Sequence, residues 1–266
     1  MPDPLRDEST PPRGAAMNPI DAVIGAGRLY GQHLAVVLPA FAALQAVKAG
    51  ILLALIAQFG EKGGGNLGWL TSSILLIAVD VAAARFVVDA HHGDVPRSPI
   101  AVIARIVPIL PLAVGVGLVS SFVLSILAAP LHMGVSTQAG AFPAIALLTV
   151  WLDARRTKGD PAAEFGVAID TTLSLTGPVI GTAVLLAAFQ LFTVELIPAL
   201  ADSAVGRHAA LARWVPVESA VSTFITPIAM MAIAGFYLQL RHPAEPAQPA
   251  APATPWPQLP GAPPAV

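Results

Sequence analysis

The chain has no cysteine and few charged residues. Without cysteine there is no disulfide framework, no thiolate nucleophile and no thiolate metal site. Charged residues make up 11% of the sequence, compared with about 25% in ordinary soluble domains, while hydrophobic residues make up 55%. So few charges could not cover the surface of a water-soluble protein of 266 residues. The net charge of −2 gives no general attraction to nucleic acid.

Both ends of the sequence lack apolar runs. Residues 1–17 are polar and proline-rich, so they do not resemble a cleaved signal peptide; we expect a disordered leader, with Met17 as an alternative start. Residues 242–266 are rich in proline and alanine, and prolines recur at every third position from Pro243 to Pro255. That spacing would align them along one edge of a polyproline II helix, which an aromatic groove could bind. We favour a disordered, solvated tail.

Six segments between these ends are apolar and long enough to cross a bilayer. About 20 apolar residues in a helix span about 30 Å of hydrocarbon. We therefore predict an all-α, polytopic membrane protein with six transmembrane helices in residues 18–241. The predicted spans are 34–59, 67–88, 106–131, 135–152, 171–194 and 219–240. The third, fifth and sixth contain no charged residue.

Lysine and arginine are unevenly distributed between the connecting segments. If the N-terminus is cytoplasmic, ten lie on the cytoplasmic side and three on the other: Arg6, Arg13, Arg28, Arg85, Arg97, Arg105, Arg155, Arg156, Lys158 and Arg241 against Lys62, Arg207 and Arg213. An excess of positive charge marks cytoplasmic loops. We predict a multi-pass protein of a bacterial inner membrane with both termini in the cytoplasm.

A capping residue followed by proline occurs three times, at Asn18–Pro19, Ser98–Pro99 and Asp160–Pro161. Asn, Ser and Asp accept hydrogen bonds from the first turn of a helix, and proline fits its first position. Each pair opens a short stretch that leads into two predicted spans. We expect short helices along the cytoplasmic interface. The pattern reflects either three repeated helix-hairpin units or chance in a chain with 26 prolines.

Two ionisable residues lie well inside predicted spans, Lys48 in the first and Asp80 in the second. Charged groups in hydrocarbon are costly and often functional. If residues 60–66 form the turn, the two side chains lie at similar depth and could form an ion pair. Such a pair would act as a proton or ion relay, bind a polar solute, or fix the rotation of the helices; the structural role is favoured.

Other residues suggest packing or lipid contact rather than chemistry. Gly177 and Gly181 form a G-x-x-x-G pattern, which lets helices approach closely within the bundle or between two copies. Arg155, Arg156 and Lys158 form a basic cluster that could contact anionic lipid, although topology explains it equally well. His91 and His92 with nearby acids could bind a metal, but adjacent histidines do not share a helix face, so we predict no metal site. We also predict no cofactor and no catalytic residue.

Three short motifs resemble a known membrane family. They are Leu29-Tyr30 before the first span, the segment 164–169 (EFGVAI) before the fifth, and the segment 237–241 (YLQLR) at the end of the sixth. Together they resemble the six-span membrane domain fused to some bacterial glycerophosphoryl diester phosphodiesterases, and its stand-alone inner-membrane relatives. The resemblance implies a helical bundle with interfacial helices. In that family catalysis belongs to a separate soluble barrel, so no catalytic or binding residue is carried over.

These observations favour a non-catalytic integral membrane protein, a scaffold or modulator of envelope or lipid processes. Its expected partners are the bilayer and either another protein or a second copy. The alternative is a small transporter or permease component that uses Lys48 and Asp80. An intramembrane enzyme acting on lipids through His91 and His92 is a third and weaker hypothesis.

Overall fold

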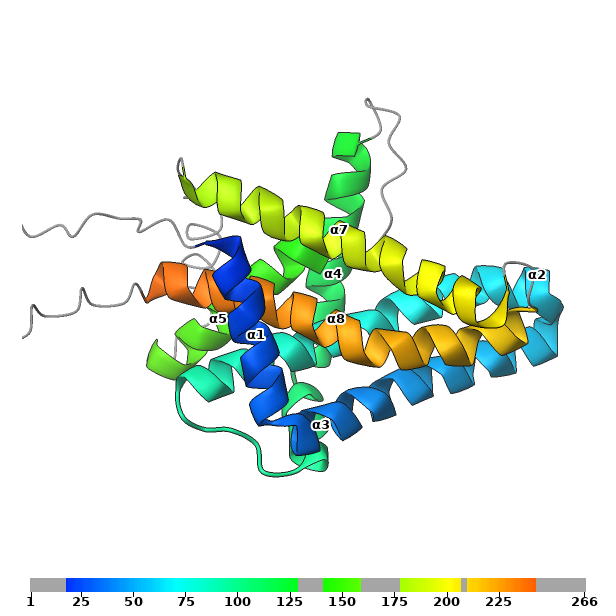
Figure 1. Ribbon diagram of the computed structural model, residues 1–266, viewed down its shortest axis with the longest axis horizontal. Coiled ribbons are helices and arrows are strands. Elements are labelled where there is room, and N and C mark those ends of the chain that lie inside the picture. Colours follow the sequence, from blue (N-terminus) through cyan, green and yellow to red (C-terminus); the bar gives the residue numbers. More distant parts are fainter. Residues whose placement is uncertain (1–17, 129–140, 159–177, 207–209, 243–266) are drawn as a thin grey trace, which may run out of the picture.

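The computed structural model describes residues 18–128, 141–158, 178–206 and 210–242, which form helices and no strand. This part of the chain confirms the all-α prediction. The helices are α1 (Pro19–Gln32), α2 (Leu34–His91), α3 (Pro99–Ile106), α4 (Leu110–Ala128), α5 (Ala141–Lys158), α7 (Pro178–Val205) and α8 (Leu211–Arg241). Figure 1 shows α2, α7 and α8 running along the long axis of the molecule and α4 standing across it. Helix α8 is central, since it packs against α1, α2, α5 and α7.

Helix α2 is a hairpin rather than one rod. It turns at Gly60, whose φ of 72° and ψ of 171° belong to a region that only glycine enters readily. The first arm matches the predicted span 34–59. The second arm begins directly after Gly60, whereas the sequence predicted a loop over residues 60–66 and a helix from residue 67. Apolar content marks where a helix can contact lipid, and the helix itself extends further.

The same reason explains why two later helices are longer than predicted. Helix α7 continues past Glu195, where the predicted span 171–194 ended, as far as Val205. Helix α8 begins at Leu211 instead of Ser219. Isolated charged residues do not end a helix, because their side chains can reach water or a partner. Residues 171–177 of the fifth predicted span lie outside the described residues.

The third and fourth predicted spans differ more from the structure. Residues 106–131 were predicted to form one span, but α3 ends at Ile106 and α4 starts at Leu110, with a bend of 66° between the two helices; residues 129–131 lie outside the described residues. Pro108 lies in the break and cannot donate a backbone hydrogen bond. Helix α5 contains residues 141–152 of the fourth predicted span and continues to Lys158 through Asp153, Arg155 and Arg156; residues 135–140 lie outside the described residues.

By length and composition, three helices of the described chain could cross a membrane: Leu34–Glu61, Gly181–Val205 and Leu211–Arg241. The bent pair α3–α4 makes up to four. The described residues therefore show three to four candidate spans where the sequence predicted six.

The two short helices α1 and α3 form where the capping motifs predicted them. Asn18 Oδ1 accepts from the backbone N–H of Ile20 at 3.0 Å, and Ser98 Oγ accepts from that of Ala101 at 3.2 Å. Both helices leave isoleucine exposed, Ile20 at 62% and Ile100 at 78%, as expected of helices at a membrane interface. The third motif, at residue 160, lies outside the described residues, so threefold repetition stays a prediction.

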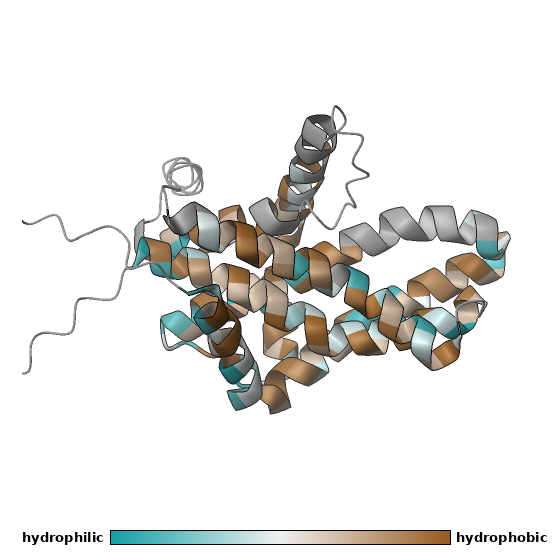
Figure 2. Cartoon of the chain, turned by 45° about the horizontal axis from the view of Figure 1, so that its top comes forward, coloured by the Kyte–Doolittle hydropathy of each residue, from teal (hydrophilic) through white to brown (hydrophobic). Residues whose placement is uncertain are grey.

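Large apolar side chains cover the outer faces of the long helices. The colouring of Figure 2 shows hydrophobic residues on the outside of the bundle as well as between its helices. Exposed examples are Val47, Ile51, Val119, Phe122, Val184, Phe192 and Phe224. Several of these side chains lie on helices that are long enough to span a bilayer, where contact with lipid would cover them.

Candidate functional site

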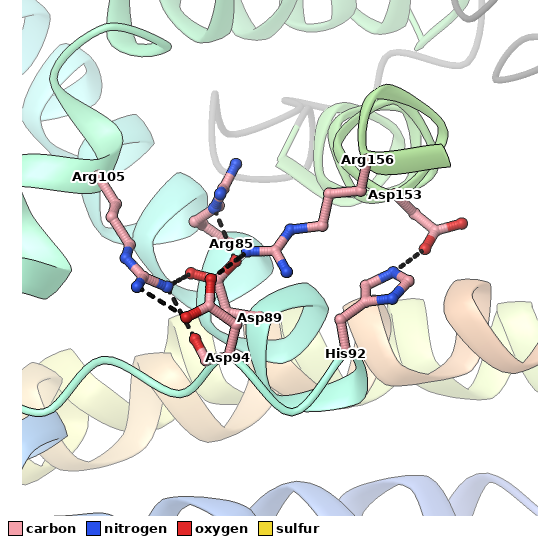
Figure 3. Close-up of polar contacts among 7 residues, drawn as sticks. All are labelled: Arg85, Asp89, His92, Asp94, Arg105, Asp153 and Arg156. Atoms are coloured by element: carbon pink, nitrogen blue, oxygen red, sulfur yellow. Dashed lines mark hydrogen bonds and ion pairs between the residues drawn. The ribbon is translucent and has the colours of Figure 1, made fainter. Parts of the chain in front are cut away.

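A buried carboxylate, Asp89, joins three elements at the end of the bundle opposite the α2 turn. Its side chain is fully buried, and three guanidinium groups surround it: those of Arg85, Arg105 and Arg156. Arg85 comes from the same helix, one turn earlier, with Nε 2.9 Å from Oδ1. Arg105 of α3 places Nη1 2.6 Å from Oδ2, and Arg156 of α5 donates to Oδ1. Figure 3 shows these side chains converging on Asp89. We call this group the Asp89 hub.

The loop that follows α2 adds a second acceptor to the hub. Asp94 accepts from Arg105 Nη2 at 3.0 Å and from Arg156 Nη2 at 2.9 Å, and its backbone carbonyl accepts from Arg105 Nη1 at 2.8 Å. Hydrogen bonds from Arg105 and Arg156 lower the pKa of this carboxyl. Two arginines are thus shared by two carboxylates, which fixes the loop on α3 and α5.

A second buried carboxylate, Asp153 of α5, collects donors from the ends of α2 and α8. Arg241 Nε lies 2.6 Å from Oδ2, His242 Nε2 2.8 Å from Oδ2 and His92 Nε2 2.8 Å from Oδ1. Burial raises the pKa of Asp153, but the hydrogen bonds from His92 and His242 and the charge of Arg241 outweigh it, so the pKa is lowered overall. We call this group the Asp153 hub.

A third histidine borders the Asp153 hub. The ring of His91 stacks on that of His242 with centroids 5.1 Å apart. Burial, followed by the neighbouring His242 and His92, lowers the pKa of His91. Among the residues that the structure describes, no group of three or more His, Cys, Asp or Glu side chains could hold a metal ion. The histidines here serve as donors and packing partners of one carboxylate.

The two hubs give each buried carboxylate several cationic or hydrogen-bonding partners. A buried charge needs such partners because its desolvation costs several kcal/mol. Both oxygens of each carboxylate have at least one such partner. The arrangement therefore ties the ends of α2, α3, α5 and α8 together.

The basic cluster predicted to contact lipid is divided by the structure. Arg156 points into the Asp89 hub instead of toward lipid. Arg155 is exposed, and its guanidinium lies 5.2 Å from the centre of the Trp151 ring, so it is free to meet an anionic headgroup. The side chain of Lys158 lies outside the described residues. For the G-x-x-x-G pattern, Gly177 also lies outside them, and Gly181 is exposed with open space around it.

The expected pair of Lys48 and Asp80 is wrong, because Lys48 binds another carboxylate. Its Nζ lies 3.0 and 3.1 Å from the two carboxylate oxygens of Glu218 on α8. The helical turn at Gly60 explains the mismatch. Lys48 lies 12 residues before Gly60 and Asp80 20 residues after it, which is about 18 Å and 30 Å along the two arms.

Asp80 is buried, at 4% exposed, and its Oδ1 atom has no hydrogen-bond partner. The sequence singled out this residue, and the structure shows that it is buried; its position within a membrane stays a prediction. Its unpartnered oxygen contrasts with Asp89 and Asp153, whose carboxylate oxygens all have partners.

Helix α8 carries charge only near its two ends. Glu218 near one end pairs with Lys48, and Arg241 at the other pairs with Asp153. The two residues are 23 positions apart, about 34 Å of helix, close to the roughly 30 Å thickness of a hydrocarbon layer. The polar groups between them are uncharged, as in the hydrogen-bonded chain Gln45–Ser222–Thr226, with distances of 3.0 and 2.8 Å.

Comparison of the chain with protein-family models, with curated proteins and with solved structures finds no match. The resemblance to the phosphodiesterase membrane domain therefore stays a prediction. Function has to be inferred from the geometry of the helices and their charged groups.

Proposed function

We propose that the chain is an integral protein of a bacterial inner membrane that crosses the bilayer six times, with both termini in the cytoplasm. Three to four helices are apolar and long enough to span, and their outer faces expose large apolar side chains. The ionic groups on α8 are separated by about the thickness of the hydrocarbon layer. The arginine-rich Asp89 hub lies at the end that the distribution of basic residues assigns to the cytoplasm.

We further propose that its role is non-catalytic, that of a scaffold or modulator of envelope or lipid processes. The observation that carries this proposal is that both oxygens of Asp89 and of Asp153 are bound by side chains that come from four helices. Such a network builds a fixed cytoplasmic platform and leaves the exposed Arg155 and Arg97 at its surface. A platform of this kind suits the binding of another protein or of anionic headgroups.

Complementation of a deletion strain tests this role. A scaffold needs its platform and has no need of an ionisable group in the membrane. Asp80→Asn, which keeps the shape of the side chain, is therefore expected to restore the wild-type phenotype at normal membrane levels. Asp89→Asn is expected to restore it poorly, because it leaves three guanidinium groups without their shared carboxylate.

The opposite pattern would contradict the scaffold. If Asp80→Asn abolished complementation while immunoblots of the membrane fraction showed wild-type levels, Asp80 would carry the function. Asp21→Asn, at an exposed aspartate of α1, is the matched control for loss of one negative charge and is expected to behave as wild type.

Transport is the second candidate function, and one observation favours it. Asp80 is a buried carboxyl with an unpartnered oxygen on a predicted membrane-spanning arm, and intramembrane acids often mark proton or solute paths. This candidate function no longer includes Lys48, because Lys48 forms an ion pair with Glu218. A solute-dependent flux in vesicles containing the purified protein, lost in Asp80→Asn, would support transport over the scaffold.

A further inference from the structure

Asp80 lies deep in the apolar part of the second arm of α2. It is nine residues from Asp89, about 13 Å of helix, and Asp89 marks the cytoplasmic boundary in the proposed topology. Half of a hydrocarbon layer of about 30 Å is about 15 Å. The carboxyl of Asp80 therefore lies near the middle of the bilayer, where water does not reach it.

Among the side chains that the structure describes, no cation pairs with this carboxyl. Of the three fully buried carboxyl groups that the structure describes, Asp89 and Asp153 each bind arginine, whereas Asp80 Oδ1 has no partner. Lys48 forms its ion pair with Glu218. Arg85 is the nearest cation in sequence, but it is engaged with Asp89 and lies about 140° around the helix from Asp80.

A bound metal ion does not fit this position in the described part of the chain. Hard cations such as Ca²⁺ and Mg²⁺ take about six or more oxygen ligands, and no cluster of three acidic or histidine side chains is present among the described residues. A lone carboxyl without a counter-charge is neutralised most simply by a proton. The protonated group gains an O–H donor, which needs one acceptor.

Backbone carbonyls supply such acceptors elsewhere in these helices. The hydroxyl of Thr149 donates to the carbonyl of Ile145 at 2.7 Å, and that of Thr223 donates to the carbonyl of Ser219 at 2.9 Å. Both groups are buried side chains that bond to the preceding turn of their own helix. A protonated aspartate has the same kind of donor on a side chain of similar length.

We propose that Asp80 is a proton-binding site in the middle of the membrane domain. The carboxyl holds a proton at neutral pH, and releases it to water only when a conformational change admits water or a cation to the site. The inference rests on the proposed membrane topology, but not on the scaffold role, since a scaffold and a proton-coupled transporter would hold the same proton.

Infrared spectroscopy of the full-length protein in lipid nanodiscs tests this inference. With carboxyl-¹³C aspartate incorporated, we expect an isotope-shifted C=O stretch of a protonated carboxylic acid at pH 7. The band should vanish in Asp80→Asn and persist in the control Asp21→Asn, and a buried group should exchange slowly into D₂O.

The wild-type spectrum alone can overturn the proposal, so the test does not depend on whether a variant folds. If no protonated-aspartate band is present at pH 7, or if the only such band appears below about pH 4, as for an ordinary aspartate, Asp80 does not hold a proton. A band at pH 7 that remains in Asp80→Asn would assign the proton to another residue and would contradict the proposal equally.

Discussion

Asp89→Asn is expected to lower the free energy of unfolding by about 3 kcal/mol, toward the lower end of the 3–5 kcal/mol typical when one partner of a buried ion pair is removed. The carboxylate of Asp89 is fully buried, and its removal leaves three guanidinium groups facing one another. These groups are 20–30% exposed, so water would screen part of their repulsion. Equilibrium unfolding in mixed detergent micelles, followed by circular dichroism, measures the change.

The matched control is Asp94→Asn in the same network. Asp94 binds two of the same arginines, but its side chain is 54% exposed, so water replaces the lost bonds at little cost. We expect a much smaller loss of stability than for Asp89→Asn. Equal losses for the two variants would show that burial of the Asp89 hub does not determine its contribution.

The second large effect is expected at the Lys48–Glu218 pair. Lys48→Met leaves a carboxylate that is 13% exposed, and Glu218→Leu leaves an ammonium group that is 9% exposed. Each single change is expected to lower the free energy of unfolding by about 3 kcal/mol or more, because it leaves a buried charge without its partner. The double variant should recover most of that loss, since an apolar pair of similar size replaces both ions. A double-mutant cycle in the same unfolding assay measures the coupling.

A second double-mutant cycle tests the pair of Lys48 and Asp80 that the sequence suggested. Lys48→Met combined with Asp80→Asn is expected to be additive, because the two residues are offset by about 12 Å along the arms of the hairpin. Coupling between Lys48 and Asp80 comparable to that between Lys48 and Glu218 would mean that the helices are arranged differently.

Local features of the fold could be predicted from the sequence. The starts of α1 and α3 follow from Asn18–Pro19 and Ser98–Pro99, because capping needs only neighbouring residues. The apolar cores of α2, α7 and α8 follow from composition. The kink before α4 also follows from the sequence, because Pro108 interrupts the backbone hydrogen bonds, whereas a search for charge-free stretches gives only the limits of the span.

The polar networks could not be predicted in the same way. Arg85 and Asp89 lie one helical turn apart, so their spacing alone indicates an ion pair. By contrast, Arg156 is 67 residues from Asp89 in the sequence, and Glu218 is 170 residues from Lys48. Such partners depend on how the helices pack. Placing the start of the second arm at residue 67 instead of residue 61, an error of six residues, was enough to bring Lys48 and Asp80 to similar depth.

Site-directed labelling of single cysteines tests the membrane topology most directly. The chain has no native cysteine, so each introduced thiol is the only one. We choose the exposed positions Ala204 and Arg97, and a maleimide that cannot cross the inner membrane. In cells with a permeabilised outer membrane, Ala204→Cys should be labelled at once, and Arg97→Cys only after the inner membrane is opened. Labelling of Arg97→Cys from outside, or protection of Ala204→Cys, would contradict the proposed arrangement of the protein in the membrane.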